Sequence, residues 1–365
     1  MEVGIIGLPN AGKSTVFNAI TRAGAEVAGY PFTTIESNMG IAAVPDERLY
    51  KIAEVVGCKK TIPATVKFID IAGLVRGASR GEGLGNQFLG YIRNVDAIVH
   101  VVRCFSDENI PHVYGAVDPK EDIETINLEL ALADIATVDR LIDKAQGRAK
   151  SGDKDTKSTL ATLAKVKSAL QEGTPMRLLG LSGDERAALA GASLLTDKPV
   201  IYVANVSEDF SEADRACFSK VAAIAEAEGA DAVEISAKVE SEIAELPSEE
   251  AEEFIRDLGL EEPGLNKVIR AAFHLLNLIT FFTTESGECR AWQIKKGTRA
   301  PQAAGKIHTD MERGFIKAEV INWANLLEEG SFHAAREHGH VRLEGKDYIV
   351  QDGDVILFRF SGGRS

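Results

Sequence analysis

The chain has little cysteine and no long apolar run. Its four cysteines stand far apart among 365 residues, and no two of them are spaced as C-x-x-C. This pattern argues against a zinc site and against a disulfide framework, and it fits a reducing compartment. No apolar stretch approaches the ~20 residues that a membrane-spanning helix requires. The first residues also lack the basic, apolar and cleavage-site series of a secretory signal, so we expect a cytoplasmic protein with no membrane partner.

A basic surplus, which is the usual mark of a nucleic-acid-binding protein, is also missing. The formal net charge is −14, from 55 acidic and 41 basic residues. The acidic excess lies before residue 278, whereas the two signs balance in residues 278–365. Because an acidic body repels nucleic acid at long range, any RNA contact is expected in that balanced segment. A chain of this length is too long for one core, so two or three domains are expected.

What the sequence does contain is a complete phosphate-binding loop. Residues 7–14 read G-L-P-N-A-G-K-S and directly follow the apolar run Val3–Ile6. The spacing G-x-x-x-x-G-K-[ST] between a strand and a helix predicts a P-loop, whose backbone N–H groups and helix dipole hold phosphates. Lys13 supplies a charge for the β- and γ-phosphates, and Ser14 a hydroxyl for Mg²⁺. The expected nucleotide contacts here are Asn10, Ala11, Gly12, Lys13, Ser14 and Thr15.

Apolar runs alternate with helical stretches in the first 277 residues, which predicts an α/β fold with a mostly parallel sheet. The expected strands are Val3–Ile6, Ala64–Asp70, Ala97–Arg103, Val200–Asn205 and Ala232–Ile235. Between the third and fourth strands, apolar residues instead recur every three or four positions on two stretches separated by a polar turn. This predicts a coiled-coil-like helical hairpin over residues 118–197, inserted into a nucleotide-binding domain of residues 1–277. Residues 278–361 read as short strands and turns, a separate α+β domain.

A second nucleotide motif, Asp70-Ile71-Ala72-Gly73, ends one of the expected strands. In phosphate-loop switches such a D-x-x-G holds Mg²⁺ through the aspartate, usually by way of water, and reaches the γ-phosphate through the glycine N–H. A threonine hydroxyl from an earlier loop completes the magnesium shell. Thr34 is the favoured residue for this role, and Thr33 is the alternative.

The residue after this motif is unusual. Many switches carry a glutamine there to orient the attacking water, but this chain has Leu74, which cannot hold a water. Hydrolysis is therefore expected to be slow or to depend on a group from elsewhere. The candidates are His112, Arg76, Arg80 and Arg103.

The base-reading segment also departs from that of GTP-binding proteins. Those proteins use N-K-x-D, in which the aspartate accepts two hydrogen bonds from guanine. Here the strand ends in Asn205-Val206-Ser207-Glu208, with no lysine and a longer carboxylate. Losing the guanine-specific pair changes specificity by orders of magnitude, so ATP is expected to be preferred over GTP. Ser236, after the last expected strand, fits the final base-contacting loop.

Together these motifs resemble the YchF-type Obg-like ATPases, which are Obg-related P-loop NTPases of the translation-factor class. The resemblance is carried by residues 7–15, 70–75, 81–86, 205–208 and 290–310, and it covers nearly the whole chain. It implies an Obg-type nucleotide domain, the inserted hairpin and a C-terminal TGS domain of β-grasp type. It also implies Mg²⁺-dependent, slow hydrolysis of ATP to ADP and phosphate, binding to the ribosome, and roles in translation and stress response.

The resemblance further implies roles for single residues. The adenine contact falls to the backbone of Val206, with Asn205 supporting the pocket. His112 matches a family histidine proposed to assist hydrolysis, and Gly73 and Leu74 belong to the switch. The large ribosomal subunit is the expected partner, with RNA contact through the TGS domain. The basic turn with Lys295, Lys296 and Arg299 is one candidate for this contact, and a solvated hairpin with no partner is the alternative. The chain itself is expected to be a monomer or a weak dimer.

Three functional interpretations stay open at this stage. The first is an ATP-driven molecular switch on the translation machinery. The second is a nucleotide-gated ribosome- or RNA-binding module in which hydrolysis is incidental. The third is a GTPase of ordinary specificity.

Overall fold

The structure is a computed structural model of the 365-residue chain. It describes residues 1–28, 38–71, 73, 77, 84–149, 155–285 and 287–361. By their contacts these residues form two compact units, and each is described by itself below. The first unit takes its described residues from Met1–Ile20, Ile35–Gly40 and Lys67–Val268, and the second from Thr21–Thr34, Ile41–Val66 and Ile269–Ser365.

A six-stranded sheet with the order β2-β4-β1-β5-β6-β7 runs through the described part of the nucleotide-motif region. Its strands are β1 (Glu2–Ile6), β2 (Met39–Ala43), β4 (Thr65–Asp70), β5 (Ala97–Arg103), β6 (Val200–Asn205) and β7 (Asp231–Ile235). The pairs β1–β4, β1–β5, β5–β6 and β6–β7 are all parallel. Strands β5 and β6 are buried along their whole length, which explains why they read as unbroken apolar runs. The predicted mostly parallel α/β fold is confirmed.

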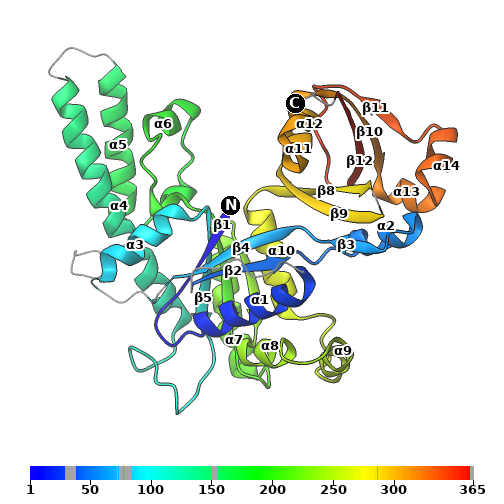
Figure 1. Ribbon diagram of the computed structural model, residues 1–365. Coiled ribbons are helices and arrows are strands. Elements are labelled where there is room, and N and C mark those ends of the chain that lie inside the picture. Colours follow the sequence, from blue (N-terminus) through cyan, green and yellow to red (C-terminus); the bar gives the residue numbers. More distant parts are fainter. Residues whose placement is uncertain are drawn as a thin grey trace. The chain divides into compact units, whose positions relative to one another are not determined.

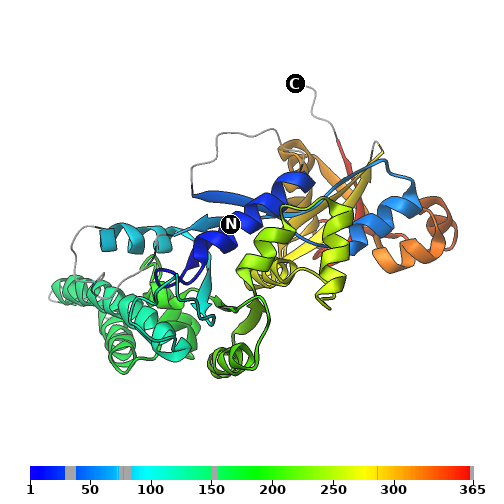
Figure 2. The ribbon, with the colours of Figure 1, turned by 90° about the horizontal axis from the view of Figure 1, so that it is seen from below.

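Helices cover the sheet. The P-loop leads into α1 (Lys13–Ala28), and α3 (Leu84–Asn94) and α7 (Glu212–Ala227) follow β4 and β6. Ile92 of α3, Ile126 of α4 (Pro119–Ala149) and Val221 of α7 share one buried cluster with side chains of β1, β5 and β6. These three helices therefore pack on one face of the sheet, where Figure 2 shows α3 (cyan) and α4 (teal) next to each other.

The start of α7 illustrates how local sequence sets an element. The Ser211 hydroxyl accepts a hydrogen bond from the Asp214 N–H at 3.3 Å, and the Asp214 carboxylate accepts one from the Ser211 N–H at 2.9 Å. This reciprocal capping box satisfies two N–H groups that a helix start leaves unpaired. After β7 the chain continues through α8 (Ala237–Ile243), α9 (Ser248–Asp257) and α10 (Gly264–Leu275).

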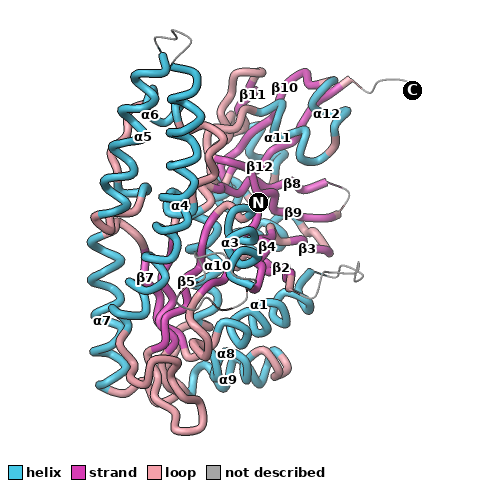
Figure 3. The backbone as a smooth tube through the Cα atoms, turned by 90° about the vertical axis from the view of Figure 1, so that its left-hand side faces the viewer, coloured by secondary structure: helices cyan, strands magenta, loops and turns pink. Residues whose placement is uncertain are grey.

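The predicted helical hairpin is confirmed as α4 and α5 (Asp155–Gln171), an antiparallel pair in Figures 1 and 3. Val138 of α4 packs with Leu163 and Val166 of α5 in a core separate from that of the sheet. The expected polar turn between the helices lies partly outside the described residues. The chain returns to β6 through the 3₁₀ helix η2 (Met176–Leu178), α6 (Gly183–Ala188) and the 3₁₀ helix η3 (Leu195–Asp197).

A buried carboxylate joins this return segment to α4. Asp134 of α4 is 1% exposed and accepts hydrogen bonds from the N–H groups of Leu195 and Thr196 at 2.8 Å each. It also accepts one from the Thr196 hydroxyl at 2.7 Å. Burial raises the pKa of Asp134, and these three hydrogen bonds oppose that rise. The base of the insertion is thus fixed by polar contacts rather than by apolar packing alone.

The second unit, as far as it is described, has a six-stranded sheet with the order β11-β10-β12-β8-β9-β3. Its strands are β3 (Lys60–Ile62), β8 (Leu278–Glu285), β9 (Glu288–Lys295), β10 (Phe315–Asn322), β11 (Arg342–Glu344) and β12 (Asp354–Phe360). Its helices are α2 (Glu47–Val56), α11 (Ala300–Ile307), α12 (Thr309–Arg313), α13 (Trp323–Glu329) and α14 (Phe332–Glu337). Ala303 of α11 packs against Phe281 and Phe358 of the sheet, which gives this unit its own core.

Three described segments fall on the other side of the division from where we expected them. Residues 21–28, 41–66 and 269–277 lie within the predicted domain 1–277, but by their contacts they belong to the second unit. Strand β3 pairs in parallel with β9, and Arg48 Nη1 of α2 lies 2.7 Å from Asp352 Oδ2. The assignment of residues 278–361 as a TGS domain stays a prediction. Within the part of the chain that the structure describes, no helix has the length and apolar character needed to cross a lipid bilayer.

Candidate nucleotide-binding site

The glycines of the P-loop permit its backbone conformation. Gly12 has φ +93°, and a Cβ there would stand 2.1 Å from Asn205 Nδ2. A Cβ on Gly7 would stand 2.4 Å from the carbonyl oxygen of Val101. Asn10 adopts the left-handed conformation, with φ 63°, which asparagine tolerates better than most residues. The motif predicted from sequence is therefore also a tightly curved loop at the carboxyl end of β1.

Lys13 lies inside this loop. Its side chain is 7% exposed, and Nζ donates a hydrogen bond to the carbonyl oxygen of Leu8 at 2.8 Å. Burial lowers the pKa of Lys13, and the nearby Asp70 carboxylate opposes that shift. A Cβ on Gly73 would lie 3.0 Å from Lys13 Nζ, so the D-x-x-G motif reaches the P-loop lysine. The two motifs, far apart in sequence, meet at one point of the sheet edge.

The residues at this point fit a magnesium ion. Ser14 Oγ donates a hydrogen bond to Asp70 Oδ2 at 2.9 Å. The other carboxylate oxygen, Asp70 Oδ1, is buried and has no hydrogen-bond partner among the described residues. A hydroxyl and a carboxylate oxygen are the hard ligands that Mg²⁺ prefers, and a buried, unpartnered carboxylate oxygen needs a cation or a water. The other predicted participants, Thr34 with its alternative Thr33, and Leu74, lie outside the described residues, as do Arg76 and Arg80.

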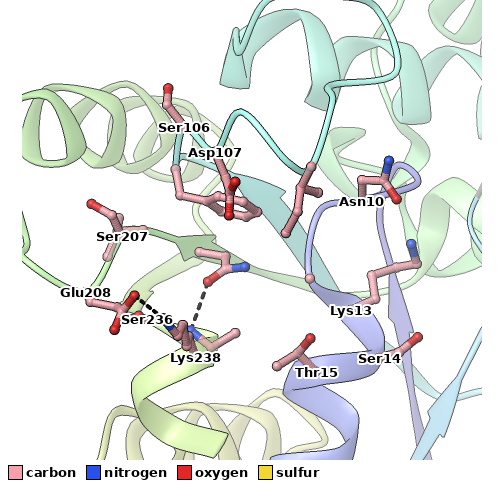
Figure 4. A pocket seen from close by; sticks show the side chains of 16 residues that line it. Asn10, Lys13, Ser14, Thr15, Ser106, Asp107, Ser207, Glu208, Ser236 and Lys238 are labelled. Carbon is pink, nitrogen blue, oxygen red and sulfur yellow. Dashed lines mark hydrogen bonds and ion pairs between the residues drawn. The ribbon is translucent and has the colours of Figure 1, made fainter.

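A cavity of about 410 Å³ extends from the P-loop across the carboxyl ends of β5, β6 and β7 (Figure 4). Its size lies within the range of small-molecule sites, and it occupies the edge where open parallel sheets bind ligands. The lining includes Asn10, Gly12, Lys13, Ser14, Thr15, Asn205, Val206 and Ser236, all predicted from sequence. Ser236 is 2% exposed, and its hydroxyl has no hydrogen-bond partner within the described part of the chain. A buried hydroxyl left unpaired beside a cavity points to a polar ligand group.

The Asn205 side chain connects two segments of this site through hydrogen bonds. It is 4% exposed; Nδ2 donates to the Ala11 carbonyl at 3.0 Å, and Oδ1 accepts from the Ala237 N–H at 2.9 Å. It thereby connects the P-loop to the segment after β7, and the part in supporting an adenine pocket that the resemblance implies stays a prediction. The N–H of Val206 is committed to the carbonyl of Ile235 at 2.8 Å. An adenine contact through the Val206 backbone would therefore use its carbonyl oxygen.

Sequence reasoning missed part of the lining. Lys238, at the start of α8, places Nζ 2.5 Å from Glu208 Oε1, and both residues line the cavity (Figure 4). The loop after β5 contributes Phe105, Ser106, Asp107 and Ile110. The signal that marks this loop is topological, because it leaves the carboxyl end of a central parallel strand. His112 follows in the same loop, but the residues nearer the strand form the cavity wall.

His112 is not among the residues that line the cavity. Its side chain is 4% exposed, with Nε2 3.1 Å from Asp122 Oδ2 at the start of α4. The Tyr114 N–H donates to His112 Nδ1 at 3.2 Å, so the proton sits on Nε2 and is donated to Asp122. The same loop does touch the P-loop, since Asn10 Nδ2 donates to the Pro111 carbonyl at 3.1 Å. A part for His112 in hydrolysis stays a prediction.

Arg103, another candidate for the catalytic group, is buried and engaged. Its guanidinium donates to the carbonyls of Phe105 at 3.1 Å, Ile110 at 2.6 Å and Asn10 at 3.4 Å. Burial lowers the pKa of Arg103. These contacts hold the β5 loop against the P-loop, and they account for the arginine without a part in catalysis.

Comparison with known proteins agrees with this arrangement. A family model described as a 50S ribosome-binding GTPase matches residues 2–138, and YchF-GTPase_C, described as a protein of unknown function, matches residues 278–361. The ribosome-binding ATPase YchF of Haemophilus ducreyi is 54% identical over 360 residues, and that of Bacillus subtilis is 53% identical over 364, with 99% of each chain covered. The solved structure of the Schizosaccharomyces pombe YchF GTPase has a TM-score of 0.87 at 37% identity, covering 98% of this chain and 97% of that one. A P-loop, a D-x-x-G motif and an N-x-x-E segment around one cavity, with relatives this similar over their full length, show that the chain belongs to the YchF family.

Proposed function

We propose that this chain is a Mg²⁺-dependent ATPase that prefers ATP over GTP and acts as a slow nucleotide switch on ribosomes, modulating translation or stress response. The observation that carries the proposal is the single cavity joining the P-loop lysine to an N-x-x-E base segment. The names of its relatives, which are called ribosome-binding ATPases, support the same activity and partner. Such a partner would place the protein in the cytoplasm.

The residues at hand have distinct parts in this activity. The P-loop N–H groups and Lys13 bind the β- and γ-phosphates, and Lys13 exchanges its bond to the Leu8 carbonyl for a phosphate oxygen. Ser14 and Asp70 would hold Mg²⁺, which when bound neutralises charge on the phosphate oxygens. Gly73, beside Lys13, would offer its N–H to the γ-phosphate. Asn205 holds the phosphate-binding and base-binding segments of the cavity together through its two hydrogen bonds.

Slow hydrolysis is expected because no candidate residue in the described part of the chain is free to orient the attacking water. Leu74 replaces the water-orienting glutamine of faster switches. His112 donates to Asp122, and Arg103 is engaged by three carbonyls. Hydrolysis assisted by His112 would therefore require the imidazole to leave Asp122. A His112→Ala variant with unchanged turnover would remove this residue from the proposed mechanism.

The nucleotide preference is tested by calorimetry. We expect ATP to bind the purified chain at least about tenfold more tightly than GTP in Mg²⁺, because the short guanine-reading aspartate is missing. A Lys13→Ala variant should lose most of this binding, and Lys51→Ala, at an exposed site of α2, serves as the control. Tighter binding of GTP, or ATP binding that survives the loss of Lys13, would overturn the assignment.

The alternative, a nucleotide-gated ribosome- or RNA-binding module with incidental hydrolysis, makes a different prediction. A switch is expected to turn over ATP faster when purified ribosomes are added, and to bind them differently with ATP and ADP. The module would bind in a nucleotide-dependent way with no change in turnover. Measuring both quantities in one ribosome titration separates the two, and separate large and small subunits would identify the expected partner.

A further inference from the structure

Two oppositely charged side chains meet at the base end of the cavity. Glu208 follows β6, and Lys238 is the second residue of α8, which follows β7, so the neighbouring strands bring them together. Lys238 Nζ lies 2.5 Å from Glu208 Oε1, and both side chains line the cavity that contains the P-loop (Figure 4). Glu208 stands at the sequence position where GTP-binding proteins carry the aspartate that reads guanine.

The backbone from which Glu208 extends is held in place. The Ser207 hydroxyl has one proton to donate and lies within hydrogen-bonding distance of two carboxylates, that of Asp214 in the first turn of α7 and that of Asp209 at 2.7 Å. The Ser207 N–H also donates to Asp214 at 3.4 Å. Lys238 is likewise anchored, because it is the second residue of α8 and the preceding Ala237 N–H is bound by Asn205. The pair is therefore formed between two backbone positions that hydrogen bonds of neighbouring residues support.

A carboxylate reads guanine by accepting hydrogen bonds from N1–H and the 2-amino group. In this structure one Glu208 oxygen is already occupied by an ammonium group, and the carboxylate charge is largely balanced by it. Glu208 raises the pKa of Lys238, and the carboxylates of Glu242 and Asp107, of which Asp107 also lines the cavity, add to that rise. Guanine would have to compete with Lys238 for Glu208.

We propose that Lys238 is a specificity-determining residue that keeps Glu208 from reading guanine. The proposal rests on the ATP preference proposed above and names the contact that enforces it. Lys238 acts here through Glu208 and not on the phosphates. Adenine gains from the same contact, because its N1 is an acceptor that a free carboxylate would repel, and the ion pair removes that repulsion.

The pair is well suited to mutation. The Glu208 and Lys238 side chains are 50% and 65% exposed, and exposed ion pairs contribute little to folding stability. Lys238→Met, which keeps the apolar stem, should therefore fold like the parent chain, and a urea titration checks this. Lys238→Arg is the matched control, because it keeps the positive charge against Glu208.

The experiment measures ATP and GTP dissociation constants by calorimetry for the parent chain, K238M, K238R, E208Q and the double variant K238M/E208Q. In K238M the ratio of GTP to ATP affinity should rise by about fivefold or more, because the freed carboxylate accepts from guanine. K238R should keep the parent ratio within about twofold, and E208Q in the K238M background should cancel the rise, which a double-mutant cycle reports as coupling.

The outcomes separate the two proposals. A K238M ratio within twofold of the parent, or a rise that survives E208Q, overturns the role of Lys238 while leaving the ATP preference intact. A parent chain that binds GTP more tightly than ATP overturns both. A rise in K238M that disappears in the double variant supports the inference.

Discussion

Replacing Asn205 with alanine is the sharpest test of how this site is built. Asn205 is buried and joins two segments through one donor and one acceptor, the Ala11 carbonyl at 3.0 Å and the Ala237 N–H at 2.9 Å. The substitution removes both hydrogen bonds and leaves two backbone groups without this partner. It also removes the side chain that a Cβ on Gly12 would strike, so the packing around the P-loop loosens.

The size of the effect follows from these contacts. A net hydrogen bond is worth about 1 kcal/mol, and a buried group left unsatisfied costs about 1–3 kcal/mol. With two bonds lost, the free energy of unfolding should fall by about 2–4 kcal/mol. For a urea slope of about 2 kcal/mol per molar, this moves the midpoint of the first unit's transition by about 1–2 M. ATP affinity should fall as well, because the phosphate and base halves of the cavity are no longer tied.

The assay combines urea unfolding without nucleotide and ATP calorimetry. Asn322→Ala is the control, because it deletes the same side chain at the exposed start of α13 in the second unit, where Oδ1 accepts from the Ala324 N–H at 3.0 Å. It should cost about 1 kcal/mol and leave ATP affinity unchanged. If Asn205→Ala changes neither the midpoint nor the affinity more than this control does, the bracing role is wrong.

Three further outcomes are expected. Asp134→Ala should lower the free energy of unfolding by about 3 kcal/mol or more, since it leaves two buried backbone N–H groups of η3 unpaired; urea titration measures this, and a loss below 1 kcal/mol would contradict it. Asp70→Asn should abolish most of the gain in ATP affinity that Mg²⁺ gives the parent chain, and calorimetry with and without Mg²⁺ would expose an unaffected gain as a refutation. The free energy of unfolding should fall as the pH drops from 6.5 toward 3, because burial lowers the pKa of His100 to about 3 and in that window only the unfolded chain protonates this imidazole. The expected slope is up to about 1.4 kcal/mol per pH unit, measured by urea titration at several pH values. The His100→Gln variant should show a smaller slope.

The sequence predicts some elements closely and misses others for a physical reason. Strands β5 and β6 are buried on both faces and appear in the sequence as apolar runs with the same bounds as in the structure. Residues 39–62 gave no such signal. Their three-residue strand β3 is partly exposed and pairs with β9, more than two hundred residues away, so its conformation depends on contacts that no local pattern records.

The same contrast divides the nucleotide site. The phosphate half is local: eight consecutive residues, with glycines where the backbone must curve, carry the whole loop. The base half is assembled from the ends of three strands, and the contact to which we assign its specificity joins Glu208 to Lys238, thirty positions further along the chain. The sequence shows that the guanine-reading aspartate is missing, but it does not show that Glu208, which takes its place, pairs with Lys238. In the specificity that we propose, the charge comes from Lys238 in α8, so a motif of four residues would not settle which purine binds. A relative that keeps N-x-x-E but has no cationic residue at the position of Lys238 is therefore expected to discriminate less sharply against GTP. The ratio of its GTP and ATP affinities would test the proposed role of Lys238 without a change to the present chain.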